Sequence, residues 1–293
     1  MAKYKVIMVG PYASRIPTGE AAKESVKALA KADAELIGVT CNTEDELIAG
    51  AKDADILIFG GAQITRRVLE SLPKLQAVIS GSVGYDQIDA DAATDNGVIV
   101  VNNPAFQWCV EEVSNHAITL LLACAKKLAF LNDGTKQGRW AECKRAQAPM
   151  VSIHGQTLGL VGCGGIGRMV SRKAQCFSLK VLGYDPYVDK SLAKEDGITL
   201  VSLPELLKES DFVSVHTFLN KETWHLIGEK EFRQMKPAAY IINTARGPVI
   251  DEPALIKALQ EKGIAGAGLT FYHQERCGDL TFELKMDNVV VTP

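Results

Sequence analysis

The stretch Gly162-Cys163-Gly164-Gly165-Ile166-Gly167 decides how the rest of this sequence is interpreted. An apolar run at residues 157–161 precedes it and predicts a strand, and residues 168–176 follow it with a helical pattern. In this strand–loop–helix context the spaced glycines permit a tight turn, close approach of the backbone to a pyrophosphate, and close packing of the helix on the strand. The stretch therefore predicts a dinucleotide-binding turn, with the pyrophosphate on the free N–H groups that begin the helix.

An acidic residue lies where such a turn requires one. Residues 180–184 predict a second strand, and Asp185 follows it, 18 residues after Gly167. A carboxylate about 20 residues beyond the glycines binds the ribose hydroxyls of the cofactor and repels a 2′-phosphate. We therefore expect NAD rather than NADP. The alternative is a glycine-rich turn without a ligand, which the complete strand–loop–helix–strand–Asp set disfavours.

Composition indicates a globular protein with no strong attraction to nucleic acid or to membranes. The chain has 293 residues, enough for two domains, with 47% hydrophobic residues, 23% charged residues and a formal net charge of −3. Its start lacks the features of a signal peptide, and no apolar run approaches the length of about 18 residues that a membrane span needs. Seven cysteines are scattered without a C-x-x-C pair. We therefore expect reduced thiols, no metal site and a cytoplasmic protein.

Strand and helix patterns alternate along the chain, which indicates an α/β fold with parallel sheets. We expect two Rossmann-like or flavodoxin-like domains with a cleft between them. Residues 1–102 have no glycine fingerprint at their first strand–helix turn and are assigned as the flavodoxin-like, substrate-binding domain. Residues 103–293 are assigned as the NAD-binding Rossmann domain. Within it, residues 111–132 predict one long amphipathic helix whose apolar face includes Leu128, and residues 134–154 predict an irregular polar segment.

Ligands of open α/β sheets bind at the carboxyl ends of the strands, so the residues at those ends are candidates for the site. In the second domain they are His216, Thr217, Thr244, Ala245, Arg246 and Thr270. In the first domain, the small residues at 81–86 follow a strand and leave backbone N–H groups that can hold a carboxylate. An ordinary strand–helix turn is the alternative for residues 81–86, and a structural ion pair is the alternative for Arg246.

Further motifs accompany the glycine stretch: residues 81–89, Arg168, Tyr184-Asp185-Pro186, residues 215–217, residues 242–251 and residues 265–269. With these motifs the sequence resembles the D-isomer-specific 2-hydroxyacid dehydrogenase family. The resemblance implies that NAD(H) exchanges a hydride with a small D-2-hydroxyacid or 2-ketoacid. Residues 109–116 are also similar to the corepressor-like branch of that family. The alternative function is therefore an NAD-binding regulatory or corepressor-like protein with weak or no catalysis.

The resemblance also implies roles for individual residues. Arg246 would hold the substrate carboxylate in a forked grip, with backbone N–H donors from Val83 and Gly84. Glu275 would hydrogen-bond the catalytic histidine and raise its basicity. A homodimer is implied, with residues 104–150 as its interface. The cofactor would be bound by Val83, Gly162, Gly164, Gly165, Ile166, Gly167, Arg168, Asp185, His216, Thr217, Thr244, Ala245, Arg246 and Thr270.

The sequence departs from the family at the residues that would take part in proton transfer. Thr270 stands where the family usually has Asp. The family's catalytic histidine, and the helix that completes its first domain, would follow Pro293, so we expect this sequence to be a truncated version of a longer protein. His273 and His216 are alternatives for that histidine. We favour a structural role for both, because a general base must reach the substrate proton itself.

Overall fold

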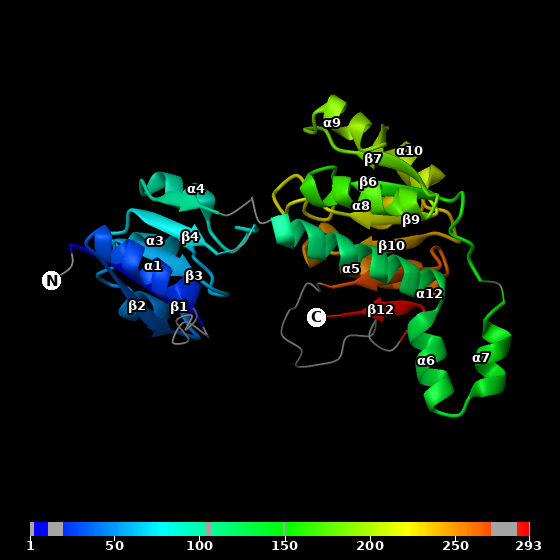
Figure 1. Cartoon of the computed structure of the whole chain (residues 1–293), viewed down its shortest axis with the longest axis horizontal. Helices are drawn as coiled ribbons and strands as arrows, with labels where there is room; N and C mark the ends of the chain where they lie inside the picture. The colour runs from blue at the N-terminus through cyan, green and yellow to red at the C-terminus, as the bar shows by residue number, and fades with distance from the viewer. Residues whose placement is uncertain are drawn as a thin grey trace. The chain divides into compact units, whose positions relative to one another are not determined.

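Parallel sheets covered by helices form both halves of the chain (Figure 1). The computed structural model describes residues 3–10, 20–81, 83–102, 107–148, 150–270 and 286–292. Glu275 and His273 lie outside the described residues. The chain divides into two compact units, Met1–Phe106 and Gln107–Pro293, and each unit contains one sheet. The expected α/β class with parallel sheets is confirmed.

The first unit has a flavodoxin-like strand order. Its five parallel strands lie in the order β2-β1-β3-β4-β5. The core between sheet and helices includes the fully buried side chains of Leu47, Leu57 and Val68. The elements are β1 (Tyr4–Gly10), α1 (Glu20–Lys31), β2 (Ala34–Thr40), α2 (Glu44–Gly50), β3 (Ile56–Phe59), α3 (Arg66–Ser71), β4 (Ala77–Ser80), α4 (Ala90–Asp95) and β5 (Ile99–Val101).

The second unit has a Rossmann-type sheet of seven parallel strands in the order β12-β11-β10-β9-β6-β7-β8. The chain runs outward from β6 to β8, then crosses to β9 and runs outward in the other direction to β12. The strand order therefore reverses between β6 and β9, the position where open sheets bind ligands. The strands are β6 (Thr157–Val161), β7 (Lys180–Tyr184), β8 (Thr199–Leu200), β9 (Phe212–Val215), β10 (Tyr240–Asn243), β11 (Gly266–Leu269) and β12 (Val289–Val291).

Helices cover both faces of this second sheet. One core contains Leu121 of α5 and Val170 of α8 against the strands, and another contains Leu206 of α10 and Leu255 of α12. Buried apolar residues on both faces are typical of parallel sheets that lie between two helical layers. The helices are α5 (Gln107–Ala125), α6 (Leu128–Lys136), α7 (Trp140–Ala146), α8 (Gly165–Cys176), α9 (Lys190–Glu195), α10 (Leu203–Glu209), α11 (Glu229–Phe232) and α12 (Glu252–Gln260).

A lysine fastens α8, the helix of the glycine stretch, to α5. The Lys173 Nζ donates to the Ser114 Oγ at 2.7 Å, the Asn115 Oδ1 at 2.6 Å and the Glu111 backbone oxygen at 3.1 Å. The Glu111 carboxylate lies 2.8 Å from the same ammonium. Because this partly buried ammonium lies among four oxygen atoms of a single helix, it ties the last turns of α8 to α5 in addition to the apolar contacts between them.

The expected single helix over residues 111–132 is wrong, because the chain turns within it. Lys127 adopts a left-handed conformation, with φ of 51°, and this separates α5 from α6. The Lys127 Nζ then donates to the backbone oxygen of Ala146 at 2.9 Å, which ties the turn to the end of α7. Leu128, expected on the apolar face, is 59% exposed. Helical periodicity does not reveal such a turn, since it depends on the backbone of one residue.

The segment expected to be irregular, residues 134–154, contains α7. Helices α6 and α7 pack against each other and extend away from the sheet (Figure 1). A side chain at Gly134 would place its Cβ 2.4 Å from the Cys143 sulfur, so glycine permits this close packing. The sequence patterns also did not predict α4, α9 and β8, because segments of at most six residues contain too few positions to show a period. Within the described residues, no helix is long and apolar enough to cross a membrane.

Candidate functional site

The glycine stretch forms the expected turn between β6 and α8. Gly162 has φ of 97°, and a Cβ there would lie 2.8 Å from the backbone carbon of His216. Gly164 is the N-cap of α8 with no side-chain cap, and a Cβ there would meet no atom within 4 Å. At Gly167 a Cβ would lie 2.2 Å from the Gly162 oxygen. Two glycines therefore permit close packing, while Gly164 leaves open space beside the helix N-terminus, where an anion is favoured.

Asp185, at the carboxyl end of β7, is held against this turn. Its Oδ2 accepts from the backbone N–H of Cys163 at 2.8 Å, and its Oδ1 accepts from those of Tyr187 at 2.8 Å and Val188 at 3.1 Å. The carboxylate therefore has one defined position beside the start of the glycine loop. Burial, with a smaller contribution from the Asp185 charge, raises the pKa of the Cys163 thiol to about 12. Cys163 consequently stays protonated and unreactive within the loop.

A histidine joins the carboxyl ends of β9 and β10. The His216 Nε2 lies 2.9 Å from the Ser214 Oγ, and its Nδ1 lies 3.5 Å from the Thr244 Oγ1. Desolvation lowers the pKa of His216 to about 4, so the ring is neutral at physiological pH. Ser214 is buried and was missed by the sequence analysis, although a serine within an apolar strand is a signal for such a partner. These contacts fit the structural role favoured for His216, which stays a prediction.

Thr217 provides an unsatisfied group beside this histidine. Its Oγ1 is buried and has no hydrogen-bond partner among the residues that the structure describes. Buried hydroxyl groups are normally paired, so an unpaired one at a strand end indicates that a ligand supplies the partner. Together with the open space at Gly164, this orphaned hydroxyl shows that the residues present fit a bound dinucleotide.

The neutral state of His216 predicts a specific pH dependence of stability. The pKa of the His216 imidazole is 6.5 in the unfolded chain and about 4 in the folded chain. The neutral ring therefore stabilises the fold fully above about pH 6.5, and this stabilisation is lost as the pH falls towards 4. The loss amounts to about 3 kcal/mol. The wild-type protein should therefore have a lower free energy of unfolding at pH 4 than at pH 6.5. We expect His216→Asn to make this difference smaller by about 3 kcal/mol, as measured by urea denaturation. His154→Asn, at an exposed histidine, is the control, and an equal reduction in both variants would contradict the prediction.

Arg246 begins the turn that follows β10. Its backbone is extended, with φ of −147°, and its carbonyl accepts from the Asn243 Nδ2 at 2.9 Å. The Oδ1 of the buried Asn243 accepts from the Ala245 N–H at 3.0 Å, so one amide side chain holds both ends of the turn. The Arg246 Nη1 donates to the Ala245 oxygen at 2.8 Å. A half-buried guanidinium is thereby held at a strand end, where it can bind a carboxylate with two parallel hydrogen bonds.

Thr270 lies at the end of the neighbouring strand β11. Both its backbone N–H and its Oγ1 donate to the Asn243 oxygen, at 3.1 Å and 3.3 Å. The hydroxyl of this buried threonine thus joins the ends of β10 and β11. It supplies no negative charge at the position where the family usually has Asp.

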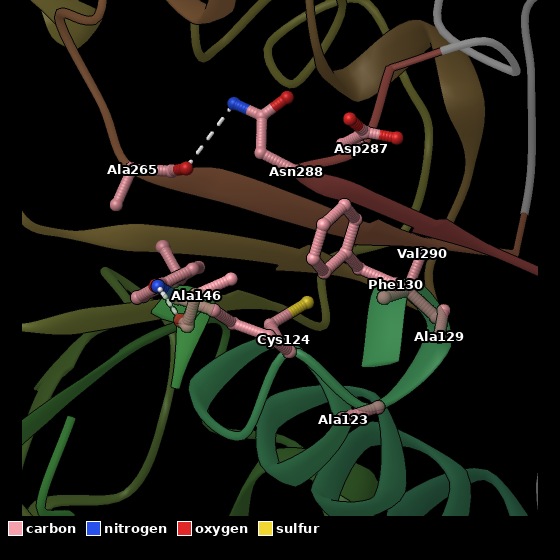
Figure 2. Close-up of a pocket in the computed structure, with 11 residues that line it drawn as sticks. Ala123, Cys124, Ala129, Phe130, Ala146, Ala265, Asp287, Asn288 and Val290 are labelled. Atoms are coloured by element: carbon pink, nitrogen blue, oxygen red, sulfur yellow. Dashed lines mark hydrogen bonds between the residues drawn. The ribbon is translucent and has the colours of Figure 1, made fainter. Parts of the chain in front are cut away.

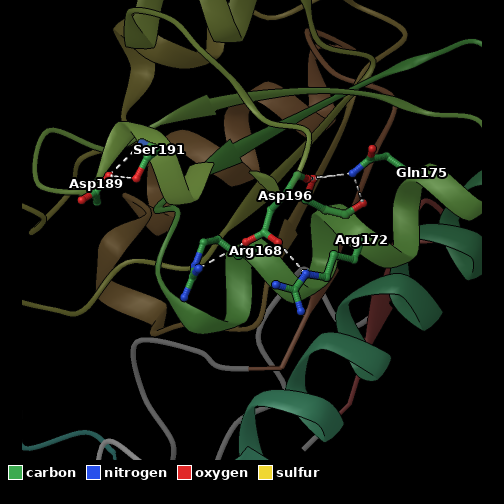
Figure 3. A network of polar contacts seen from close by, with 7 residues as sticks. Arg168, Arg172, Gln175, Asp189, Ser191 and Asp196 are labelled. Atoms are coloured by element: carbon green, nitrogen blue, oxygen red, sulfur yellow. Dashed lines mark hydrogen bonds and ion pairs between the residues drawn. The ribbon is translucent and has the colours of Figure 1, made fainter. Parts of the chain in front are cut away.

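Arg168, the expected phosphate ligand, is fastened to a buried carboxylate (Figure 3). Its Nη1 lies 3.3 Å from the Oδ2 of Asp196, whose side chain is 3% exposed, and the Nε of Arg172 lies 2.5 Å from the Oδ1. The Gln175 side chain donates to the Asp196 backbone oxygen at 2.8 Å. Asp196 was missed by the sequence analysis, because nothing in the spacing connects it with a helix that begins about 30 residues earlier. The network fixes a positive charge one residue after the glycine stretch.

Val83 and Gly84 belong to the first unit, and Arg246 belongs to the second. The Val83 oxygen accepts from the Asn102 Nδ2 at 2.8 Å, and the Gly84 oxygen accepts from the Ser80 Oγ at 2.9 Å. Both carbonyl groups thus accept hydrogen bonds from side chains of their own unit.

A cavity of about 250 Å³ lies at the other end of the second sheet (Figure 2). Its lining includes Cys124, Phe130, Tyr240 and Asn288, and the last two stand at the amino ends of β10 and β12. Burial raises the pKa of the Cys124 thiol to about 12, so the thiol is protonated and unreactive. The cavity is therefore separate from the strand ends that carry the nucleotide site.

Comparison with known proteins agrees with this arrangement. The family model described as "D-isomer specific 2-hydroxyacid dehydrogenase, NAD binding domain" matches residues 118–293 of this chain. A glyoxylate reductase of Korarchaeum cryptofilum is 41% identical over 84% of this chain and 74% of its own length. A D-3-phosphoglycerate dehydrogenase of Methanocaldococcus jannaschii is 39% identical over 86% of this chain, which spans 47% of that relative. The structure of D-lactate dehydrogenase from Aquifex aeolicus, complexed with NAD and lactic acid, matches with a TM-score of 0.78 and 30% identity over 98% of this chain and 87% of that one.

A parallel sheet with a glycine-rich turn and an acidic residue after its second strand defines an NAD-binding Rossmann domain. The chain belongs to the D-isomer specific 2-hydroxyacid dehydrogenase family. It is a dehydrogenase of CH–OH groups that transfers a hydride between NAD(H) and a small hydroxy or keto acid. The resemblance, the cofactor and the class of reaction expected from the sequence are confirmed.

Proposed function

We propose that this chain reduces a small 2-ketoacid such as glyoxylate, or oxidises the corresponding D-2-hydroxyacid, with Arg246 as the residue that binds the carboxylate. The observation that carries the proposal is the position of Arg246. It follows β10, which lies two strands from β6 in the sheet, and Asn243 holds its turn. A guanidinium fixed at this edge suits a planar acid with two adjacent oxygen atoms, and the glyoxylate reductase relative supports the size of the substrate.

The side chains have separate tasks in the proposed mechanism. NAD, when bound, supplies or accepts the hydride. Asp185 holds the ribose hydroxyls, the start of α8 and Arg168 hold the pyrophosphate, and Thr217 donates to or accepts from the cofactor near its reacting end. Arg246 orients the ketoacid and stabilises the negative charge that develops on the carbonyl oxygen during reduction. Glu275, which lies outside the described residues, keeps its proposed role of orienting the family's catalytic histidine, which would follow Pro293 and would donate the proton to the carbonyl oxygen.

Three further parts of the proposal concern organisation. Residues 1–102 act as the substrate-binding domain, with the N–H groups of Val83 and Gly84 as carboxylate donors, and residues 103–293 act as the NAD-binding domain. The protein works in the cytoplasm, as its scattered, unpaired cysteines suggest. It forms a homodimer through residues 104–150, supported by the 67% exposure of Trp140 on α7 and 59% exposure of Leu128 on α6. Sedimentation velocity of the wild-type chain tests the dimer directly.

Spectrophotometric oxidation of NADH tests the reaction. We expect glyoxylate, pyruvate or hydroxypyruvate to be reduced, and hydroxyacetone, which lacks the carboxylate of pyruvate, to be reduced at least about a hundredfold less efficiently, because the charge-assisted bonds to Arg246 are lost. NADPH in place of NADH is the matched cofactor control. If NADH binds but no ketoacid is reduced, the proposed activity is wrong and an NAD-binding regulatory role is favoured.

A further inference from the structure

Two loops flank the carboxyl end of β6, and a side-chain hydrogen bond joins them. In the sheet, β6 lies between β7 and β9, so the turns after β7 and β9 stand on either side of the start of the glycine stretch. Tyr187 follows β7 and Glu222 lies in the loop after β9. The Tyr187 hydroxyl donates to the Glu222 Oε2 at 2.6 Å. Because strands two places apart are separated by about 10 Å, a long tyrosine side chain is needed to bridge them.

Both ends of this bridge are held by their own turns. The Tyr187 N–H donates to Asp185, which places the tyrosine and the proposed ribose ligand in one turn. The Glu222 N–H donates to the Asn220 Oδ1 at 2.9 Å, and the Thr223 hydroxyl donates to the Phe218 oxygen at 2.6 Å. The bridge therefore connects two ordered loops.

The stability of the fold does not account for this bridge. Tyr187 is 77% exposed, so it contributes little to a core, and exposed polar pairs contribute little to stability. Its hydroxyl donates to one carboxylate, and a second carboxylate lies in its own turn. Glu222 first, and Asp185 to a smaller extent, raise the pKa of Tyr187, which keeps the hydroxyl protonated and able to donate. The bridge thus connects a second carboxylate, that of Glu222, to the turn of Asp185, the residue that is expected to distinguish NAD from NADP.

We propose that Tyr187 and Glu222 form a clasp over the adenosine half of the cofactor, and that Glu222 acts with Asp185 to exclude a 2′-phosphate. This inference rests on the nucleotide site of the proposed function. The exposed ring of Tyr187 offers an apolar face to the adenine base, and aromatic side chains bind bases in this way. The hydrogen bond to Glu222 holds the ring in place, and the carboxylate repels a phosphate on the neighbouring ribose.

Calorimetric titration with ADP-ribose tests the clasp without the reacting half of the cofactor. We expect Tyr187→Phe and Glu222→Ala each to weaken ADP-ribose binding by about fivefold, the loss of one hydrogen bond, and the double variant to be no weaker than either single variant. We expect Glu222→Gln to reduce the preference for ADP-ribose over 2′-phospho-ADP-ribose by about tenfold. Glu261→Gln, at an exposed carboxylate that caps the carboxyl end of α12, controls for the change in net charge and leaves both affinities unchanged.

The possible results separate the clasp from the rest of the proposed function. Unchanged or tighter ADP-ribose binding by Tyr187→Phe would overturn the clasp, since a bridge that obstructs the site gives tighter binding when broken. An unchanged preference in Glu222→Gln would overturn the role of its charge. If wild-type protein does not bind ADP-ribose, the nucleotide site and the clasp fail together. If it binds ADP-ribose with the expected variant effects but reduces no ketoacid, the clasp stands and the proposed activity fails. Thermal unfolding of each variant verifies that the fold is retained.

Discussion

Replacing Arg246 with glutamine lowers kcat/KM for ketoacid reduction by about a thousandfold, while NADH affinity changes by less than about threefold. The large effect is expected because the guanidinium contacts the charge that develops on the substrate, and loss of one such donor costs a hundred- to a thousandfold in rate. Asn243 holds the backbone of this turn through the Arg246 carbonyl and the Ala245 N–H, so the substitution leaves the turn intact. Steady-state kinetics with glyoxylate and NADH fluorescence titration measure the two quantities.

Two variants make this result specific. Arg246→Lys keeps the charge but not the planar fork, and we expect it to recover about tenfold of the lost efficiency. Arg233→Gln removes an exposed arginine whose partner is Glu229, and it should leave kcat/KM unchanged. If Arg246→Gln loses less than about tenfold, Arg246 does not bind the substrate and the structural ion pair becomes the better interpretation.

Replacing Gly162 with alanine destabilises the second unit by about 3 kcal/mol and removes NADH binding. The φ of 97° is strained for any residue with a Cβ, and that Cβ would lie 2.8 Å from backbone atoms of His216, which cannot move without shifting β9. Strain and overpacking each cost about 1–3 kcal/mol. Urea denaturation measures the change in unfolding free energy, and fluorescence titration measures NADH affinity.

Gly164→Ala separates cofactor binding from stability. Gly164 has φ of −69°, and a Cβ there meets no atom within 4 Å, so we expect no loss of stability. The same Cβ occupies space that the pyrophosphate needs, and we expect NADH affinity to fall by more than about tenfold. Normal NADH binding by Gly164→Ala would show that the pyrophosphate does not approach this loop.

Local chemistry explains why much of the fold and the nucleotide site could be predicted. The turn conformation at Gly162 and the order of strand, glycines, helix and Asp185 depend on residues that are close in sequence. Alternation of apolar runs similarly predicts parallel strands, because both faces of these strands are buried. The failures also have a local cause, since one left-handed residue at Lys127 ends α5 and exposes Leu128 without changing the helical pattern.

The sequence by itself determined the α/β class, the dinucleotide turn, the preference for NAD and the candidate arginine at the end of β10. Tertiary structure alone decided which distant side chains meet: Thr244 with His216, Asp196 with Arg168, and Glu222 with Tyr187. The physical reason is that strand order and helix packing bring residues far apart in the sequence to one edge of the sheet. Hydrogen bonds with distance limits of a few tenths of an ångström then select their partners, and no sequence spacing specifies such distances.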